Sequence, residues 1–118
     1  MKKIYYLSTC DTCKRIMNEL DLPDAFERQD IKAKAISESQ LEEMKALSGS
    51  YESLFSKRAR LYKELGLKDK ALTENEYKSY ILEHYTFLKR PVIVINNKIF
   101  IGNSKKSVEA AKNALNEQ

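Results

Sequence analysis

The sequence predicts an α/β fold in which the two ends of the chain build one sheet and a helical insertion separates them. Short segments rich in β-branched and aromatic residues lie near both ends of the 118-residue chain. Residues 36–86 show helical periodicity and no strand pattern of their own. The composition, with 42% hydrophobic residues, 32% charged residues and only three glycines, is typical of one compact, helix-rich domain.

The N-terminal part of the chain has a β-α-β pattern. Residues 3–7 form the first expected strand and residues 25–31 the second. Between them, residues 14–20 carry apolar side chains at helical spacing, and the proline in residues 22–24 closes that helix. The small polar stretch of residues 8–13, which holds both cysteines, therefore lies at the junction of the first strand and the first helix.

The middle of the chain is expected to be helical. Ser37 and Thr73 each begin a capping box, which predicts a helix start after each of them. A further basic helical region is expected over residues 51–65, and Gly66 is expected to end it. The side chains expected along one face of the first and third helices are Leu41, Met44, Leu47, Tyr77, Tyr80, Ile81 and His84.

The C-terminal part has a β-β-α pattern. Residues 91–95 form a buried strand, Asn96-Asn97 suits a tight turn, and residues 98–101 form the pairing strand. Gly102 is expected to relieve crowding where that strand meets the last helix. The inward-facing residues expected in the last helix are Val108, Ala111, Ala114 and Leu115.

The complete element order is that of thioredoxin with an insertion between its halves. We predict a thioredoxin-like core over about residues 1–35 and 87–118, with the helical insertion over about 36–86. The whole of residues 1–118 is expected to form a single domain.

Charge, hydropathy and cysteine content exclude several functional classes. The 21 basic and 17 acidic side chains give a net charge of only +4, and the lysines are scattered among glutamates, so direct nucleic-acid binding is not expected. The longest apolar runs, such as residues 92–95, are far too short to cross a membrane, and the N-terminus has no signal-peptide pattern. We therefore expect a cytoplasmic protein. With two cysteines and one histidine, no metal site and no bound cofactor are expected.

The two cysteines are the main candidates for chemistry. Cys10 stands at a helix start, where the helix dipole and unpaired N–H groups favour the thiolate, and Lys14 and Arg15 add positive charge. Cys13 follows one helical turn later, so its sulfur can reach Cys10 and resolve a mixed disulfide. Asp11 and Thr12 offer polar groups at the same helix start. The alternative interpretation is two ordinary small cysteines on a helix.

Two further positions are candidates for the site. Pro91 directly precedes a buried strand, where a thioredoxin-like fold has a cis proline beside the cysteine loop; the alternative is an ordinary edge proline. Arg90 precedes it, and an arginine beside a thiolate can stabilise the thiolate and hold an oxyanion. Arg58 could do the same or lie on a solvated helix face, whereas Arg60 is expected on a solvated face. His84, the only histidine, is expected to pack rather than catalyse.

Together these motifs resemble the ArsC/Spx family. The resemblance rests on Cys10-Asp11-Thr12-Cys13 after a Tyr-Tyr-Leu strand, on Arg58 seven residues before Leu65, and on the segment from Leu88 through Arg90-Pro91 to Val94. It covers nearly the whole chain. The family includes glutaredoxin-linked arsenate reductases, YffB-like proteins and Spx transcriptional regulators.

The resemblance implies a role for each site residue. Cys10 is similar to the family's nucleophile, which attacks arsenate before glutathione resolves the adduct. Arg58 and Arg90 resemble the arginines that hold the anion and lower the thiol pKa. Ser8 and Thr9 occupy the positions of the family's anion loop, so the expected substrate-binding set is Ser8, Thr9, Asp11, Thr12 and Pro91.

The chain departs from the arsenate reductases in two places. The stretch Ile101-Gly102-Asn103-Ser104 lacks the third arginine of those enzymes, and its Gly102 is like the glycine of Spx and YffB-like members. Cys13 has a counterpart in Spx, whereas most arsenate reductases lack one.

The resemblance therefore leaves two main functional hypotheses. The first is a cytosolic thiol-dependent oxidoreductase with Cys10 as nucleophile, Cys13 or glutathione as the resolving thiol, and a small oxyanion or thiol substrate. Glutathione would be its co-substrate and glutaredoxin a partner. The second is a Spx-like regulator that binds RNA polymerase through a Cys10–Cys13 switch. An inactive relative is a third hypothesis, and a monomer is expected in each case.

Overall fold

The computed structural model describes residues 2–117. The chain divides into two compact units, one formed by Met1–Lys34 with Arg90–Gln118 and the other by Ala35–Lys89. The first unit contains the sheet and both cysteines. The second contains the residues between the two halves of the sheet.

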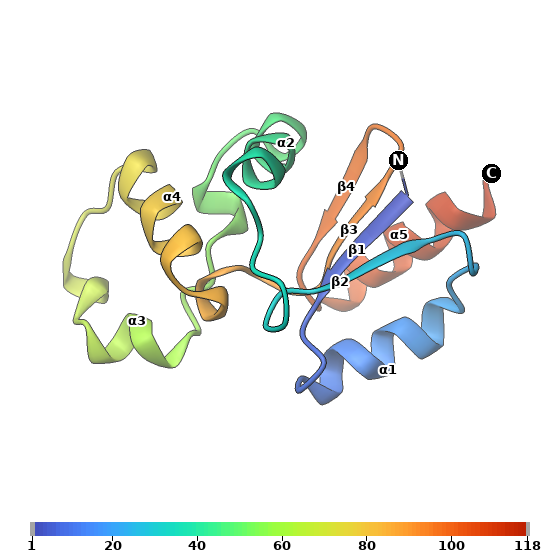
Figure 1. Cartoon of the computed structure of the whole chain (residues 1–118), viewed down its shortest axis with the longest axis horizontal. Coiled ribbons are helices and arrows are strands. Elements are labelled where there is room, and N and C mark those ends of the chain that lie inside the picture. The colour runs from blue at the N-terminus through green and yellow to red at the C-terminus, as the bar shows by residue number, and fades with distance from the viewer. Residues whose placement is uncertain (1, 118) are drawn as a thin grey trace. The chain divides into compact units, whose positions relative to one another are not determined.

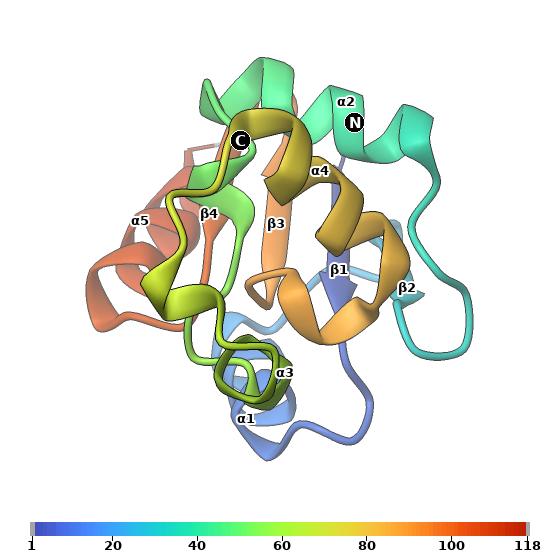
Figure 2. The same cartoon turned by 90° about the vertical axis from the view of Figure 1, so that its left-hand side faces the viewer.

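The first unit is built on a four-stranded mixed sheet. Its strand order is β2-β1-β3-β4, which can be followed across Figure 2. β1 pairs in parallel with β2 and antiparallel with β3, and β3 pairs antiparallel with β4. The parallel pair requires a crossover, which the first helix supplies. The strands span β1 Lys2–Tyr6, β2 Glu27–Asp30, β3 Val92–Ile95 and β4 Lys98–Ile101.

Two helices, α1 (Asp11–Leu20) and α5 (Lys105–Asn116), cover one face of this sheet (Figure 1). The apolar side chains of both helices meet those of the central strands, because residues at helical spacing share a face with alternate strand residues. Burial of each large apolar side chain stabilises the fold by roughly 1.5–3 kcal/mol. The core residues are Ile4, Ile16, Leu20, Leu22, Phe26, Ile93, Ile95, Val108, Ala111 and Ala114, with Leu115 partly buried against them.

The turns of the first unit lie where the sequence predicts them. Asn96 adopts a left-handed conformation with φ of 57° between β3 and β4, as a tight hairpin turn requires. Gly102, after β4, has φ of 86°, and its N–H donates to the carbonyl of Pro91 over 2.9 Å. A Cβ at Gly102 would meet no atom within 4 Å, so the expectation of crowding is wrong. Its left-handed backbone is the feature that favours glycine.

The second unit is helical, with α2 (Glu38–Ser48), α3 (Arg60–Glu64) and α4 (Glu74–Glu83). Both predicted capping boxes are present: the Ser37 and Thr73 side chains each accept an N–H at the third helical position. The three short 3-10 turns of this unit are η1 Glu52–Leu54, η2 Leu67–Asp69 and η3 Tyr85–Phe87.

The prediction of one helical region over residues 51–65 is wrong. The structure has η1, an extended stretch and then the short α3, after which Gly66 takes a left-handed conformation as predicted. The extended stretch pairs with a distant segment, because the Ser56 N–H donates to the Phe87 carbonyl over 2.7 Å. The Lys89 N–H donates in turn to the Leu54 carbonyl over 2.8 Å. These bonds replace the helical ones that local sequence favours.

Aromatic side chains form the centre of the second unit. Phe55 stacks on Phe87 with ring centroids 5.3 Å apart and meets Tyr77 at 4.8 Å. Leu41 and Met44 of the predicted helical stripe are buried, whereas Leu47 is 36% exposed. His84 lies beyond the end of α4 and is exposed, so its expected place on that helix is wrong. Its Nδ1 accepts the Thr86 N–H and caps η3, and its ring stacks on Tyr85 with centroids 4.6 Å apart, which agrees with a packing role.

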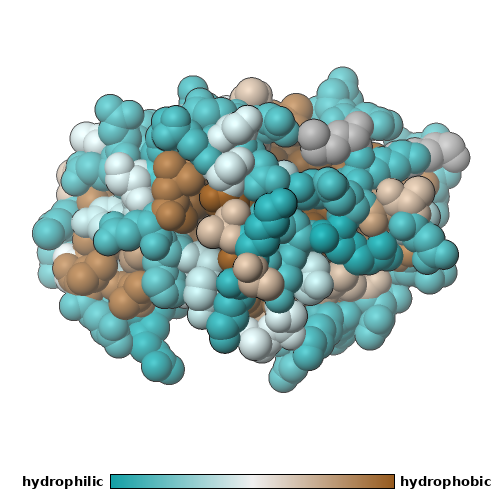
Figure 3. All heavy atoms as spheres, viewed as in Figure 1, coloured by the Kyte–Doolittle hydropathy of each residue, from teal (hydrophilic) through white to brown (hydrophobic). Residues whose placement is uncertain are grey.

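The surface is mainly hydrophilic. On the face that Figure 3 shows, hydrophobic residues form only small separate patches. The exposed large hydrophobic side chains in the described part of the chain are Leu47 and Leu65. Within residues 2–117, none of the helices combines the length and the apolar character needed to traverse a lipid bilayer.

Candidate thiol site

Cys10 occupies the N-cap of α1. A turn leads into it from β1, closed by the Cys10 N–H, which donates to the Leu7 carbonyl over 3.0 Å. Cys10 itself is extended, with φ of −98° and ψ of 110°, and its carbonyl accepts the Lys14 N–H over 3.2 Å. The N–H groups of the first helical turn have no intrahelical acceptor, so a side chain at this position can receive them. The predicted placement of Cys10 at a strand-to-helix junction is confirmed.

The surroundings of Cys10 favour its thiolate. Burial raises the pKa of the Cys10 thiol, but hydrogen bonds from the Cys13 N–H, the Cys13 thiol and the Thr12 N–H oppose burial, as does the positive charge of Arg90. The net result is a Cys10 pKa below its usual value. A thiolate is the nucleophilic form of cysteine, so the lowered pKa raises the reactive fraction of the half-buried Cys10 sulfur.

Cys13 differs from Cys10 in both its burial and the direction of its pKa shift. It is fully buried, and burial is the main cause that raises its pKa to about 11. The neighbouring Cys10 raises this pKa further, through its hydrogen bond and its charge. Cys13 therefore stays protonated at neutral pH and acts as a donor to Cys10. Both cysteines are free thiols in the structure.

Arg90 and Pro91 belong to the same unit as the cysteines. The Arg90–Pro91 peptide bond is cis, and Pro91 is buried directly before β3. The positive charge of Arg90 lowers the pKa of both thiols. The structure therefore connects the predicted site residue Arg90 electrostatically with Cys10.

The remaining predicted site residues of this unit surround the start of α1. Asp11 is the exposed first residue of α1, and Thr12 is half-buried with its N–H directed at Cys10. Thr9 is exposed in the turn before Cys10. Ser8 is half-buried, and its N–H donates to Asp30 Oδ1 over 3.3 Å.

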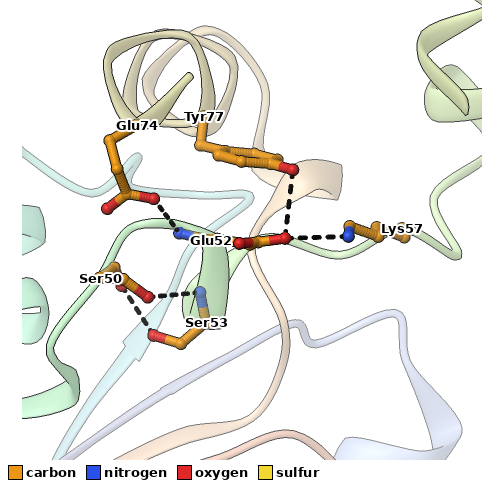
Figure 4. A network of polar contacts seen from close by, with 6 residues as sticks. All are labelled: Ser50, Glu52, Ser53, Lys57, Glu74 and Tyr77. Carbon is orange, nitrogen blue, oxygen red and sulfur yellow. Dashed lines mark hydrogen bonds and ion pairs between the residues drawn. The ribbon is translucent and has the colours of Figure 1, made fainter. Parts of the chain in front are cut away.

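Arg58 lies in the second unit. It is exposed, in the turn that precedes α3, and Arg60 is exposed at the first position of α3, as expected for a solvated residue. A polar network holds the chain just before Arg58 (Figure 4). In it, Glu52 accepts from Lys57 Nζ over 3.1 Å and from the Tyr77 hydroxyl over 3.4 Å. The role of Arg58 in anion binding stays a prediction.

Sequence reasoning did not single out Asp30. This residue ends β2, and its carboxylate accepts N–H groups from Ser8 and Lys32. A signal was available, because an aspartate at the end of a second parallel strand in a β-α-β unit lies beside the end of the first strand. In the described residues 2–117, no three His, Cys, Asp or Glu side chains are grouped so that they could hold a metal ion.

The sequence as a whole places this site in a known family. A profile of the ArsC family matches residues 5–111. The chain belongs to the ArsC family. No curated protein sequence matches it.

Solved structures of ArsC-related proteins have the same fold. A proposed arsenate reductase from Yersinia pestis is 20% identical with a TM-score of 0.75, over 93% of this chain and 99% of that one. An arsenate reductase from Vibrio cholerae is 23% identical with a TM-score of 0.72, over 92% and 95% of the two chains. A YffB protein is 22% identical with a TM-score of 0.76, over 94% and 98%. The predicted thioredoxin-like α/β fold, with a helical segment between its halves, is confirmed.

Proposed function

We propose that this ArsC-family protein is a thiol-dependent reductase of arsenate or a similar small oxyanion, with Cys10 as the nucleophile. The observation that carries the proposal is the position of Cys10 at the start of α1, where N–H groups, the Cys13 thiol and Arg90 lower its pKa. The names of the matched structures from Yersinia pestis and Vibrio cholerae supply the substrate.

In the proposed first step the Cys10 thiolate attacks the arsenic atom of arsenate. A sulfur–arsenic bond forms, one arsenic–oxygen bond breaks, and the departing oxygen takes up protons and leaves as water. The same groups that lower the Cys10 pKa hold the anion: the N–H groups at the start of α1 and the guanidinium of Arg90. Thr9, Asp11, Thr12 and Pro91 would line this binding site.

In the second step another thiolate attacks the Cys10 sulfur. A disulfide forms, the sulfur–arsenic electron pair stays on arsenic, and arsenic(V) is reduced to arsenic(III), which leaves as arsenite. The attacking thiol is glutathione or Cys13, and glutathione or glutaredoxin then reduces the disulfide. Burial, the largest cause of the raised Cys13 pKa, persists in this step and keeps Cys13 mainly protonated, which favours glutathione.

The experiment is an arsenate-dependent NADPH oxidation assay with glutathione, glutaredoxin and glutathione reductase. The wild-type protein is compared with Cys10→Ser and Cys13→Ser. We expect turnover that Cys10→Ser abolishes and Cys13→Ser retains, because serine still donates a hydrogen bond to Cys10. Loss of turnover in Cys13→Ser as well as in Cys10→Ser would assign the second step to Cys13. Absence of turnover in the wild type, or turnover that survives Cys10→Ser, would contradict the proposal.

One observation favours a second candidate, a redox regulator of RNA polymerase. The Cys13 thiol donates to Cys10, so the two sulfurs are neighbours. The resemblance of Gly102 to the glycine of Spx-like members, described from the sequence, is consistent with this candidate. Oxidation to a Cys10–Cys13 disulfide would then change the surface offered to the polymerase. Capture of purified RNA polymerase by the oxidised protein, and not by the reduced protein or by Cys13→Ser, would support this function. For either function we propose a cytoplasmic monomer.

A further inference from the structure

Asp30 lies at the sheet edge from which the Cys10 turn departs. It is the last residue of β2, and the parallel register pairs it with Tyr6, the last residue of β1. The pairing continues one residue further, since the Ile31 N–H donates to the Tyr6 carbonyl over 2.9 Å. The backbone of Asp30 is therefore fixed by strand pairing, beside the point where the chain leaves β1 for the thiol site.

The Asp30 carboxylate binds the first residue of that departing chain. Its Oδ1 accepts the Ser8 N–H over 3.3 Å and the Lys32 N–H over 3.1 Å. The Ser8 side chain interacts with this carboxylate as well, and this interaction is the main cause of a lowered Asp30 pKa. At neutral pH the carboxylate is therefore ionised, and it accepts the backbone N–H of Ser8.

Ser8 is the second residue of the four-residue turn that ends at Cys10. Leu7 is buried on one side of the turn, and the Cys10 N–H closes it by donating to the Leu7 carbonyl over 3.0 Å. Because Asp30 holds Ser8 between these two fixed points, the path of the turn, and with it the direction from which Cys10 enters α1, depends on one side chain from another strand.

We propose that Asp30 is a positioning residue of the thiol site, acting through Ser8 to hold Cys10 at the N-cap of α1. Ser8 is then an anchor of the turn and not a ligand of the substrate anion, because its N–H donates to the Asp30 carboxylate and its side chain interacts with the same carboxylate. The negative charge of Asp30 gives the Cys10 thiolate no help of its own. The benefit comes from geometry, which keeps Cys10 within reach of the N–H groups of Thr12 and Cys13. This inference rests on the proposed role of Cys10 as nucleophile.

The geometric effect can be separated from the charge effect by three substitutions. Asp30→Asn removes the charge but keeps an oxygen that accepts the Ser8 N–H. Asp30→Ala removes both, and Asp30→Glu keeps the charge but displaces the carboxylate by one methylene. Asp24→Asn, at an exposed position before β2, is the matched control for a lost negative charge.

The measurement is the rate of Cys10 alkylation by iodoacetamide as a function of pH, with peptide mapping by mass spectrometry. Asp30→Ala and Asp30→Glu are expected to raise the midpoint by about half a pH unit, which slows alkylation at pH 7 on the order of threefold. Asp30→Asn and Asp24→Asn are expected to keep the wild-type midpoint. An unchanged midpoint in both Asp30→Ala and Asp30→Glu would overturn the proposal, as would equal shifts in Asp30→Asn and Asp30→Ala.

Circular dichroism and thermal unfolding of each variant identify any that fail to fold. If Asp30→Ala does not fold, the result of Asp30→Glu decides the test, since this variant keeps the charge and adds only one methylene. The alkylation assay contains neither arsenate nor glutathione. A protein without reductase activity can therefore still show the predicted Asp30 effects, and an active reductase can still fail to show them.

Discussion

Replacement of Cys13 by alanine is expected to raise the pKa of Cys10. The substitution removes the thiol that donates to the Cys10 sulfur and leaves the Cys13 N–H, the Thr12 N–H and Arg90 in place. A hydrogen bond to a charged group contributes about 1.5–3 kcal/mol, and because a thiol is a weak donor the lower end applies. About 1.4 kcal/mol corresponds to one pH unit, so the midpoint of Cys10 reactivity is expected to rise by about that amount.

The assay for this prediction is the pH dependence of Cys10 alkylation in the wild type, Cys13→Ala and Cys13→Ser. At pH 7, Cys13→Ala is expected to react up to about tenfold more slowly than the wild type. Cys13→Ser is the matched control, because its hydroxyl keeps a donor at the same place, and it should stay close to the wild type. An identical midpoint in wild type and Cys13→Ala would refute the reasoning that the buried thiol activates Cys10.

Three further predictions follow from the same structure. Arg90→Gln is expected to raise the midpoint of Cys10 alkylation, because it removes the positive charge that favours the thiolate; high salt should reduce the difference from wild type. Ser37→Ala and Thr73→Ala are each expected to lower the free energy of unfolding by about 1 kcal/mol in urea titrations, whereas Ser39→Ala, at an exposed position within α2, should have a smaller effect. The third prediction concerns pH, because folding lowers the Cys10 pKa. The thiolate's contribution to stability is present above the ordinary thiol pKa and is lost as the pH falls through the folded-state pKa. Unfolding titrations between these two values should show a free energy of unfolding that rises with pH in the wild type and rises less in Cys10→Ser.

Local patterns were sufficient to predict much of this fold. The capping boxes at Ser37 and Thr73 and the turn at Asn96 each depend on residues within four positions of one another, so sequence alone identifies them. The thiol site was predictable for a related reason. Cys10 and Cys13 share one helix start, and the physics of a helix N-terminus does not depend on distant parts of the chain.

Features that depend on distant pairing could not be predicted in the same way. Residues 51–65 have helical character, but the extended stretch around Ser56 is decided by hydrogen bonds to Phe87 and Lys89, more than 30 positions later. Asp30 reaches Ser8 across 22 positions, and only the parallel pairing of β1 and β2 brings them together. Neither contact leaves a periodic pattern in the sequence.

The measurement that tests the central claim most directly is the alkylation of Cys10 with and without arsenate across a range of pH. We expect iodoacetamide to label Cys10 with a midpoint below that of an ordinary thiol, buried Cys13 to remain unlabelled, and arsenate to slow the labelling of Cys10. A Cys10 midpoint at or above the ordinary thiol value, or a labelling rate that arsenate leaves unchanged, would contradict the central claim.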